Sequence, residues 1–298
     1  MESSQIKKTL LSIGAISEKH IEVFSTRTRD AEIPVFRDVV SEVIFIDDYY
    51  VGDQEYINGV ARKDSQPLED LLDTQRRIRE HTSAIYGKKI LDFGFGPGTF
   101  LEAAKATASS VTGVELELQA EEFSARTGIQ TFGRLSELTH PIDTVFAFHV
   151  LEHLPDPLGW LTEIREVLMG NNGSLIIEVP HARDLLLTSV PSEAFRSHTL
   201  WSQHLVLHTR ESLRKLLLFA GFTVGAIYGV QRYGLGNHLG WMSEGRPGTH
   251  FEAPFRSIES RELTSAYESS LVSLDLSDTL VAIASPNESQ SAIGPEFL

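Results

Sequence analysis

Three glycines in alternate positions follow a short apolar run, and this arrangement is suited to bringing backbone against a ligand. The run Ile90–Phe93 is typical of a buried strand, and Gly94, Gly96 and Gly98 lead into a segment typical of the first turn of a helix. Glycine lacks a Cβ, so the main chain can adopt positive φ and a bulky group can approach it. The free N–H groups at the start of a helix favour a polar or anionic group. The stretch therefore predicts a ligand-binding turn.

The spacing of these glycines separates two classes of ligand. A dinucleotide-binding turn carries G-x-G-x-x-G, whereas this chain carries G-x-G-x-G and has Thr99 where the third glycine of that pattern would stand. The spacing therefore disfavours NAD. An NAD-dependent oxidoreductase with altered spacing and a glycine-rich connection without a ligand both stay open as alternatives.

Two acidic residues accompany the glycines and give the stretch a resemblance to a known family. Asp92 stands just before Gly94, and Glu115 follows the next apolar run, Val111–Val114. Together with the glycines they resemble the class I S-adenosylmethionine-dependent methyltransferases. The resemblance implies that the glycine turn passes under the methionine end of S-adenosylmethionine. It also implies that Glu115 accepts from both ribose hydroxyls, a task that suits a carboxylate because both of its oxygens are acceptors.

The resemblance covers residues 86–229 and 279–284 and includes two further segments, His149–His153 and Phe219–Phe222. The first of these is similar to the branch that acts on small molecules and sugars. Residues 231–250 look like methyltransferases of surface-polysaccharide and nucleotide-sugar pathways, which implies polysaccharide biosynthesis and a sugar or sugar-nucleotide acceptor. The residues implied to bind the cofactor are Asp92, Gly94, Phe95, Gly96, Gly98, Glu115, Leu116, Leu135 and His149.

Strand and helix patterns alternate along most of the chain. This alternation predicts an α/β fold with a doubly wound parallel sheet, and the resemblance implies the seven-stranded, Rossmann-like methyltransferase sheet. Residues 1–63 are predicted to form an N-terminal β-rich wing, and residues 64–285 the methyltransferase core. Within that core, residues 231–258 are predicted to form a lid without regular structure before the last strand, and residues 286–298 a flexible tail.

Two histidines follow strands at the edge where ligands of such a sheet bind. Methyl transfer requires the protein to align the acceptor, to exclude water and to remove a proton if the acceptor is a hydroxyl or an acidic carbon. Histidine is the natural base near neutral pH. His153, one turn past the fourth strand, is predicted as the catalytic base, and His181, just past the fifth strand, is the second candidate. A structural role is the alternative for each.

The segment His149-Val150-Leu151-Glu152-His153 also offers metal ligands on one helical turn. Some quinone O-methyltransferases with a similar Glu-x-x-Glu-His arrangement bind a divalent ion there. In this chain His149 replaces the first acid, which makes Mg²⁺ a poor match because it prefers oxygen ligands. The sequence therefore predicts no metal. The absence of cysteine excludes a thiolate zinc site.

The acceptor site is predicted from residues in the wing, the connection after the fifth strand, and the lid. Arginine binds phosphate or carboxylate groups with a planar fork, and histidine and asparagine offer polar contacts. The predicted acceptor-binding residues are Tyr50, Arg196, His204, Arg232, Asn237 and His238. The alternative is that Arg232 lies at the surface and that Asn237 belongs to a turn.

The composition narrows the classes of partner. The 298 residues include 26 Lys and Arg against 41 Asp and Glu, a net charge of −15, and basic residues do not cluster. Nucleic acid is therefore not a predicted partner, and no apolar run approaches the roughly 20 residues of a membrane span. The sequence predicts a cytoplasmic enzyme acting on a small molecule, with a homodimer left open. A regulatory protein that binds the cofactor without catalysis is the alternative function.

Overall fold

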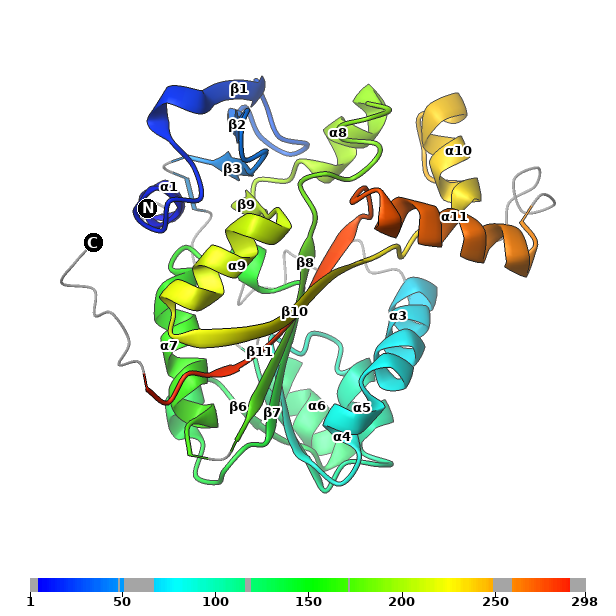
Figure 1. Ribbon diagram of the computed structural model, residues 1–298. Helices are drawn as coiled ribbons and strands as arrows, with labels where there is room; N and C mark the ends of the chain where they lie inside the picture. The colour runs from blue at the N-terminus through cyan, green and yellow to red at the C-terminus, as the bar shows by residue number, and fades with distance from the viewer. Residues whose placement is uncertain are drawn as a thin grey trace.

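A seven-stranded sheet runs through the part of the chain that the structure describes, which is residues 5–47, 49–50, 67–115, 119–170, 172–248 and 259–289 of a computed structural model (Figure 1). Its strands are β4 (Lys89–Phe93), β5 (Ser110–Val114), β6 (Gln130–Phe132), β7 (Thr144–Phe148), β8 (Ser174–Pro180), β10 (Phe222–Val230) and β11 (Thr279–Pro286). Their order is β10-β11-β8-β7-β4-β5-β6. The predicted α/β class with seven strands is confirmed.

The direction of one strand differs from the prediction. Strands β6, β5, β4, β7 and β8 are parallel, but β11 pairs antiparallel with both β8 and β10. Thr279 at the start of β11 therefore lies opposite Pro180 at the end of β8. This reversal brings the residues just before β11 to the edge where the parallel strands end.

Helices cover both faces of this sheet (Figure 1). On one side lie α3 (Pro67–Glu80), α4 (Thr82–Ile85), α5 (Thr99–Ala104) and α6 (Gln119–Thr127), and on the other α7 (Pro157–Leu168) and α9 (Arg210–Phe219). Neighbouring residues of β4 are therefore buried on opposite faces of the sheet: Ile90 and Leu91 are both fully buried but belong to different hydrophobic clusters. A strand that is covered on both faces needs a continuous apolar run, which is what this sequence contains.

The N-terminal residues form a second, smaller sheet that lies beyond one end of the first (Figure 1). Its elements are α1 (Ile6–Ser12), the short 3₁₀ helix η1 (Glu18–His20), β1 (Ile21–Ser25), β2 (Val35–Asp38) and β3 (Ile44–Ile46), joined by β9 (Val206–Leu207). The strand order is β1-β2-β3-β9, and all three pairings are antiparallel. The predicted N-terminal β unit is confirmed. The long connection after β8 contributes β9 to it, which the sequence did not predict.

The predicted lid contains regular structure. Helix α10 (Leu235–Glu244) lies within it, so the prediction of an irregular segment was wrong for these residues, while residues 249–258 lie outside the described part. Glycines in this segment disfavour a helix by about 1 kcal/mol each, which explains the prediction. In the structure a Cβ on Gly240 would lie 2.2 Å from the backbone nitrogen of Gly248, so the glycine permits close packing of the chain that returns past the helix.

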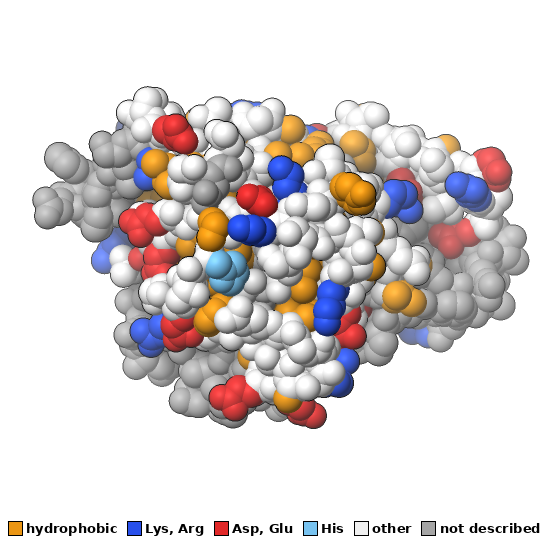
Figure 2. Space-filling view, turned by 90° about the horizontal axis from the view of Figure 1, so that it is seen from below, with side chains coloured by type: hydrophobic (Ala, Val, Ile, Leu, Met, Phe, Trp, Pro, Cys, Tyr) orange, Lys and Arg blue, Asp and Glu red, His pale blue; other side chains and the backbone are white. Residues whose placement is uncertain are grey.

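The remaining described elements are two helices and two short 3₁₀ helices. Helices α8 (Glu193–Thr199) and α11 (Arg261–Ser273) lie on the same side as α10 in Figure 1, and the 3₁₀ helices η3 (Leu135–Glu137) and η4 (Leu151–His153) follow β6 and β7. Figure 2 shows the end of the molecule opposite to the smaller sheet, where basic and acidic side chains of the described residues are interspersed.

Among the described helices, none has the length and apolar character to cross a membrane.

A buried ion-pair cluster joins α3 to the sheet. The carboxylate of Glu178 in β8 is fully buried and accepts from Nε and Nη2 of Arg77 at 2.9 and 2.7 Å, while Arg76 contacts it at 2.9 Å. Burial would raise the pKa of Glu178, but Arg77 and Arg76 outweigh it and hold that pKa below its usual value. The carboxylate is therefore ionised and pairs with both guanidinium groups, of which Arg76 also pairs with Asp73 and Glu80.

Replacing Glu178 by alanine should lower the free energy of unfolding by about 3 kcal/mol, because two buried cations lose a partner. Denaturant unfolding of the wild-type chain and the variant measures the difference. Glu163→Ala is the matched control, since Glu163 is exposed on α7 and its loss should change stability by less than about 0.5 kcal/mol. Equal effects of the two substitutions would contradict the role given to the cluster.

Candidate functional site

A cavity of about 560 Å³ opens where β4, β5, β7 and β8 end. Residues from the turns after all four strands line it. Residues from the N-terminal part, from the connection after β8 and from the lid complete the lining. The chain leaves β4 toward β5 and returns on the other side to β7, and ligands of open α/β sheets bind at such a reversal of strand order. The volume suits a small-molecule ligand.

The turn after β4 has the backbone that its glycines predicted. Gly94, Gly96 and Gly98 have φ of 72°, 59° and 77°, in the left-handed region that side chains disfavour. A Cβ on Gly94 would lie 2.5 Å from Cγ2 of Val150, and one on Gly98 would lie 2.1 Å from the ring of Phe123. Glycine is therefore required here by both backbone conformation and space, and bare main chain lines the cavity.

Two acids flank this turn. Glu115, just past β5, accepts a hydrogen bond from the Gly96 N–H at 3.0 Å, which holds the carboxylate against the glycine turn. Asp92 is buried at the end of β4, and burial raises its pKa to about 8 although Arg77 opposes the shift. Phe95, within the turn, packs on Phe123 with ring centroids 4.9 Å apart. Main chain without side chains, a carboxylate and an aromatic residue thus line one part of the cavity.

His149 follows β7 directly and has an unusual backbone, with φ of 55°. Its Nε2 lies 3.2 Å from Nη1 of Arg232, and since arginine can only donate, Nε2 accepts and the proton resides on Nδ1. Nδ1 lies 3.4 Å from Oε1 of Glu152. Burial, with Arg232 and Arg77, holds the pKa of His149 well below its usual value, so this ring is neutral.

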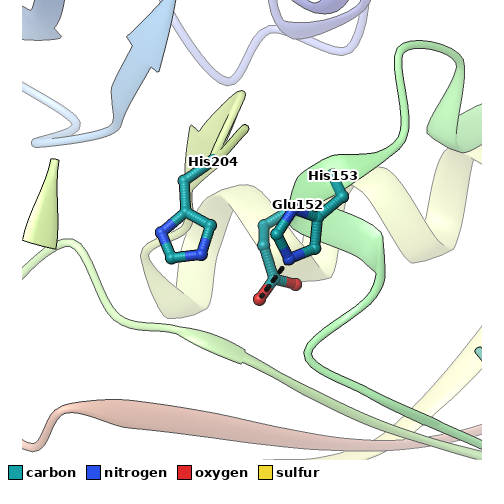
Figure 3. A group of neighbouring side chains, drawn as sticks. All are labelled: Glu152, His153 and His204. Carbon is teal, nitrogen blue, oxygen red and sulfur yellow. Dashed lines mark ion pairs between the residues drawn. The ribbon is translucent and has the colours of Figure 1, made fainter. Parts of the chain in front are cut away.

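Glu152 and His153 of η4 lie beside His204, which comes from the connection before β9 (Figure 3). His153 donates from Nδ1 to the carbonyl of Gln203 at 2.8 Å, and the carbonyl of Glu152 accepts from the Leu205 N–H at 2.8 Å. These two hydrogen bonds hold residues 203–205 against η4. All three side chains line the cavity. Burial lowers the pKa of His153 to about 4, so the ring is neutral at physiological pH.

His181, the second histidine predicted as a base, also lines the cavity. Its Nδ1 donates to the carbonyl of Ser277 at 2.9 Å, and its Nε2 lies 3.8 Å from Asp275. Burial lowers the pKa of His181 to about 4 although Asp275 opposes this. The structure thus brings both predicted histidines to one cavity, each with one ring nitrogen held by a backbone carbonyl.

The predicted acceptor residues divide into two groups. Tyr50, His204, Arg232, Asn237 and His238 line the cavity. Arg196 is not among the lining residues, because its guanidinium donates to the carbonyl of Leu187 at 2.9 Å and lies over the ring of Phe24. Of the predicted cofactor residues, Leu135 packs in the hydrophobic core while Gly133 lines the cavity, and Leu116 lies outside the described residues.

The cavity also holds residues that the sequence did not indicate as part of a site. Trp201 and Trp241 come from loop and lid segments without a spacing pattern. Asp184 is buried and Asp278 is half-buried, and burial raises the pKa of both carboxyls, that of Asp184 to about 8 with Asp278 adding to the shift. Asp278 was missed because the sequence predicted a parallel sheet, and it is the antiparallel direction of β11 that brings its first residues to the cavity.

The sequence and this architecture both match one family. Residues 65–227 match the family described as a methyltransferase domain. This chain belongs to that methyltransferase family. The matched residues include the glycine turn, Glu115 and η4, so the predicted family is confirmed. The sugar and polysaccharide branch of methyltransferases is not distinguished by this match and stays a prediction.

Several relatives of the methyltransferase share a name. The "Ubiquinone biosynthesis O-methyltransferase" of Actinobacillus pleuropneumoniae serotype 5b is 26% identical over 106 residues, which are 30% of this chain and 45% of that protein. The protein of the same name from Idiomarina loihiensis is 31% identical over 91 residues, 27% of this chain and 37% of the relative. The chain thus spans less than half the length of these curated relatives.

Solved structures share the methyltransferase fold at low sequence identity. A chain from the complex between the Haloferax volcanii Trm112 methyltransferase activator and a methyltransferase aligns with a TM-score of 0.52 and 14% identity, covering 80% of this chain and 100% of that one. The plantazolicin methyltransferase BamL, in complex with a triazolic desmethylPZN analog and SAH, aligns with a TM-score of 0.50 and 14% identity, covering 79% and 94%. The predicted Rossmann-like methyltransferase sheet is confirmed.

An ion pair within the cavity should make the stability of the methyltransferase depend on acid pH. Nε of Arg232 donates to Oδ2 of Asp73 at 2.8 Å, and Nη2 of Arg232 contacts the same oxygen. Burial alone would raise the pKa of Asp73, but Arg232 and Arg77 lower it to about 2. A carboxylate whose pKa is lower in the folded than in the unfolded chain stabilises the fold above the unfolded value and loses that contribution as pH falls.

We expect this contribution to be complete above about pH 4 and to disappear as the pH falls toward 2, a change of about 2 kcal/mol. Asp73→Asn removes the titrating group. The difference in unfolding free energy between wild type and Asp73→Asn should therefore shrink by about that amount between pH 5 and pH 2. A difference that stays constant over this range would contradict the assignment.

Proposed function

We propose that this methyltransferase transfers the methyl group of S-adenosylmethionine to an oxygen of a small acceptor that carries an aromatic, quinone-type ring. The glycine turn and Glu115 support the cofactor assignment, because a side-chain-free backbone and a carboxylate acceptor fit a nucleoside with ribose hydroxyls. When bound, S-adenosylmethionine supplies a methyl group on a positively charged sulfur that is already a good leaving group. The chain's own task is to hold the acceptor in line, to exclude water and to accommodate a proton.

The observation that carries the acceptor class is a set of aromatic side chains that line the cavity, called the aromatic wall here: His153, Trp201, His204, Phe195 and Trp241. Trp201 lies 5.8 Å from His153 and 5.4 Å from His204 between ring centroids, and Phe195 lies 5.4 Å from Trp241. Such rings favour another flat ring through stacked or edge-to-face contacts. The ubiquinone O-methyltransferase name of the relatives agrees with this class of acceptor. The wall and the glycine turn line one cavity, so acceptor and cofactor would meet there.

The proton of an acceptor hydroxyl would leave near His153. Because Nδ1 of His153 donates to Gln203, its Nε2 carries a lone pair and faces Glu152. As the oxygen attacks, the O–C bond forms, the S–C bond breaks with its electron pair going to sulfur, and the hydroxyl proton goes to this nitrogen or to solvent. A pKa of about 4 makes His153 a weak base on its own. Transfer of the proton to His153, the predicted base, and release of the proton to solvent are therefore both part of the proposal.

A sugar-like acceptor is the second candidate, supported by the polar end of the same cavity. Asp184, Asp278, Asn237 and His238 line it there. His238 Nδ1 lies 2.7 Å from the hydroxyl of Tyr267, so this histidine is part of a hydrogen-bonded group. Several polar groups in one buried pocket suit a molecule with many hydroxyls. The sugar acceptor, a homodimer and a cytoplasmic location all stay predictions.

The cofactor assignment predicts that the chain binds S-adenosylhomocysteine with a stoichiometry of one and does not bind NAD. Isothermal titration calorimetry measures both. Glu115→Ala should weaken S-adenosylhomocysteine binding by about tenfold to a hundredfold, because two ribose hydroxyls lose a charged acceptor. Glu121→Ala, an exposed acid on α6, is the matched control and should leave affinity unchanged. Binding of NAD without the sulfur ligand would show that the proposed function is wrong.

The aromatic wall predicts which acceptors turn over. Ring-bearing phenols and aromatic diols should be methylated, with oxygen as the acceptor, more efficiently than sugar nucleotides in a methyl-transfer assay. Trp201→Ala should lower kcat/KM for the best phenol by about tenfold or more, since a stacking surface is lost, while S-adenosylhomocysteine affinity stays the same. Tyr86→Ala, an aromatic residue 72% exposed after α4, is the control. Methylation of sugar nucleotides but not of phenols would select the second candidate.

A further inference from the structure

Arg29 lies in the connection between β1 and β2 of the smaller sheet and lines the cavity at the end of the larger one. Its guanidinium carbon lies over the ring of Trp201, 4.4 Å from the ring centroid. A cation at this distance is attracted to the face of an indole ring. Because Trp201 belongs to the aromatic wall, a positive charge lies beside the surface to which we assign the ring of the acceptor.

The loop that carries Arg29 is bonded to the segment that carries Trp201. The N–H of Arg29 donates to the carbonyl of Leu200 at 2.7 Å. Both carboxylate oxygens of Asp30 accept from Ser202, one from its N–H at 3.1 Å and the other from its hydroxyl at 2.6 Å. These bonds hold the residues on either side of Trp201, so they fix the place of Arg29 beside the wall.

The charge of Arg29 acts on the neighbouring side chains. Burial, with His153 and Arg29 acting in the same direction, holds the pKa of His204 well below its usual value, so this ring is neutral. Burial also raises the pKa of Glu152 to about 8, so this carboxyl is mostly protonated at neutral pH. Neither His204 nor Glu152 therefore places a full negative charge against Arg29.

A guanidinium has five N–H donors in one plane, and two of them match the two oxygens of a carboxylate. Five donors allow Arg29 to keep its contacts within the chain and still donate to a ligand. Arg77 and Arg232 also line the cavity, but they bond to Glu178 and Asp73 and hold the fold together. Arg29 differs from them because it lies against the aromatic wall.

We propose that Arg29 binds a carboxylate carried by the ring of the acceptor, and that the substrates of this chain are therefore aromatic hydroxy acids. The inference rests on the proposed function, which places the acceptor ring against the aromatic wall. The carboxylate does not react, so its bond to Arg29 would be equally strong before and during methyl transfer. Arg29 would thus determine which acceptor binds and leave the rate of the transfer step unchanged. Arg196, which the sequence predicted for such a task, is not among the residues that line the cavity.

The test compares 3,4-dihydroxybenzoate with 3,4-dihydroxybenzamide, which has nearly the same shape and no charge. The wild-type chain should methylate the acid with a kcat/KM at least about tenfold above that for the amide. Arg29→Gln should raise KM for the acid by about tenfold or more, leave its kcat within about twofold, and leave both constants for the amide unchanged. Arg29→Lys should retain part of the preference, because it keeps the charge and loses the planar fork.

Arg27→Gln is the matched control. This exposed arginine pairs with Glu32 in the same loop and is not among the residues that line the cavity, so its loss should change the constants for neither compound. Calorimetric titration of each compound into the complex with S-adenosylhomocysteine measures binding without turnover. The affinity for the acid should fall by about tenfold or more in Arg29→Gln, and the affinity for the amide should stay the same.

The outcomes separate this inference from the proposed function. Equal use of acid and amide by the wild type, or an equal loss of both activities in Arg29→Gln, would overturn the carboxylate site and leave methyl transfer to phenols in place. Binding of the acid that depends on Arg29 but is not followed by methylation would support the site and refute the proposed reaction. Failure of both compounds to bind would overturn the inference, and the assay with neutral phenols then decides the proposed function by itself.

Discussion

The turn after β4 lies so close to the side chain of Val150, in the turn after β7, that Gly94 has no space for a side chain, and the rest of the site depends on this contact. Gly94 has φ of 72°, and a Cβ added there would lie 2.5 Å from Cγ2 of Val150, while His149, just before Val150, has φ of 55°. The same contact therefore sets the path of the glycine turn on one side and the start of η4 on the other. The regions proposed for cofactor and acceptor are adjacent because two neighbouring strands end in turns that contact each other.

Ion pairs at the cavity join α3 to the sheet and to the segment after β10. Arg77 of α3 pairs with Glu178 of β8, and Arg232, which follows β10, pairs with Asp73 of α3. Asp73 and Arg232 are 159 residues apart in the chain, so the pair joins its first and last thirds. Burying one charge without its partner is costly, so these segments are held to one arrangement. That arrangement also sets the proton on His149, since Nε2 of His149 must accept from Arg232.

The shape of the glycine turn and the place of Glu115 beside it could be predicted from sequence, and the approach of His204 and Trp201 to the cavity could not, for a physical reason. Gly94, Gly96, Gly98 and Glu115 act through short-range backbone geometry, and the spacing of residue types reports on that directly. His204 and Trp201 reach the cavity because β9 pairs with β3, a non-local contact with no local signature. Arg196 has the chemistry of an anion-binding residue, but a nearby backbone carbonyl uses its donors. The glycines of α10 indicated a loop because their packing partner was unknown.

In the segment from His149 to His153, residue type alone does not predict which ring nitrogen of each histidine carries the proton. His149 precedes η4 and His153 ends it, and hydrogen bonding gives the two histidines opposite characters. Arg232 places the proton of His149 on the nitrogen that faces Glu152, whereas the Gln203 carbonyl draws the proton of His153 away from it. The proton of His149 therefore lies on the ring nitrogen nearer to Glu152, and that of His153 on the nitrogen that faces Gln203. Residue type and spacing treat the two histidines alike, and the difference follows from partners 83 and 50 residues further along the chain.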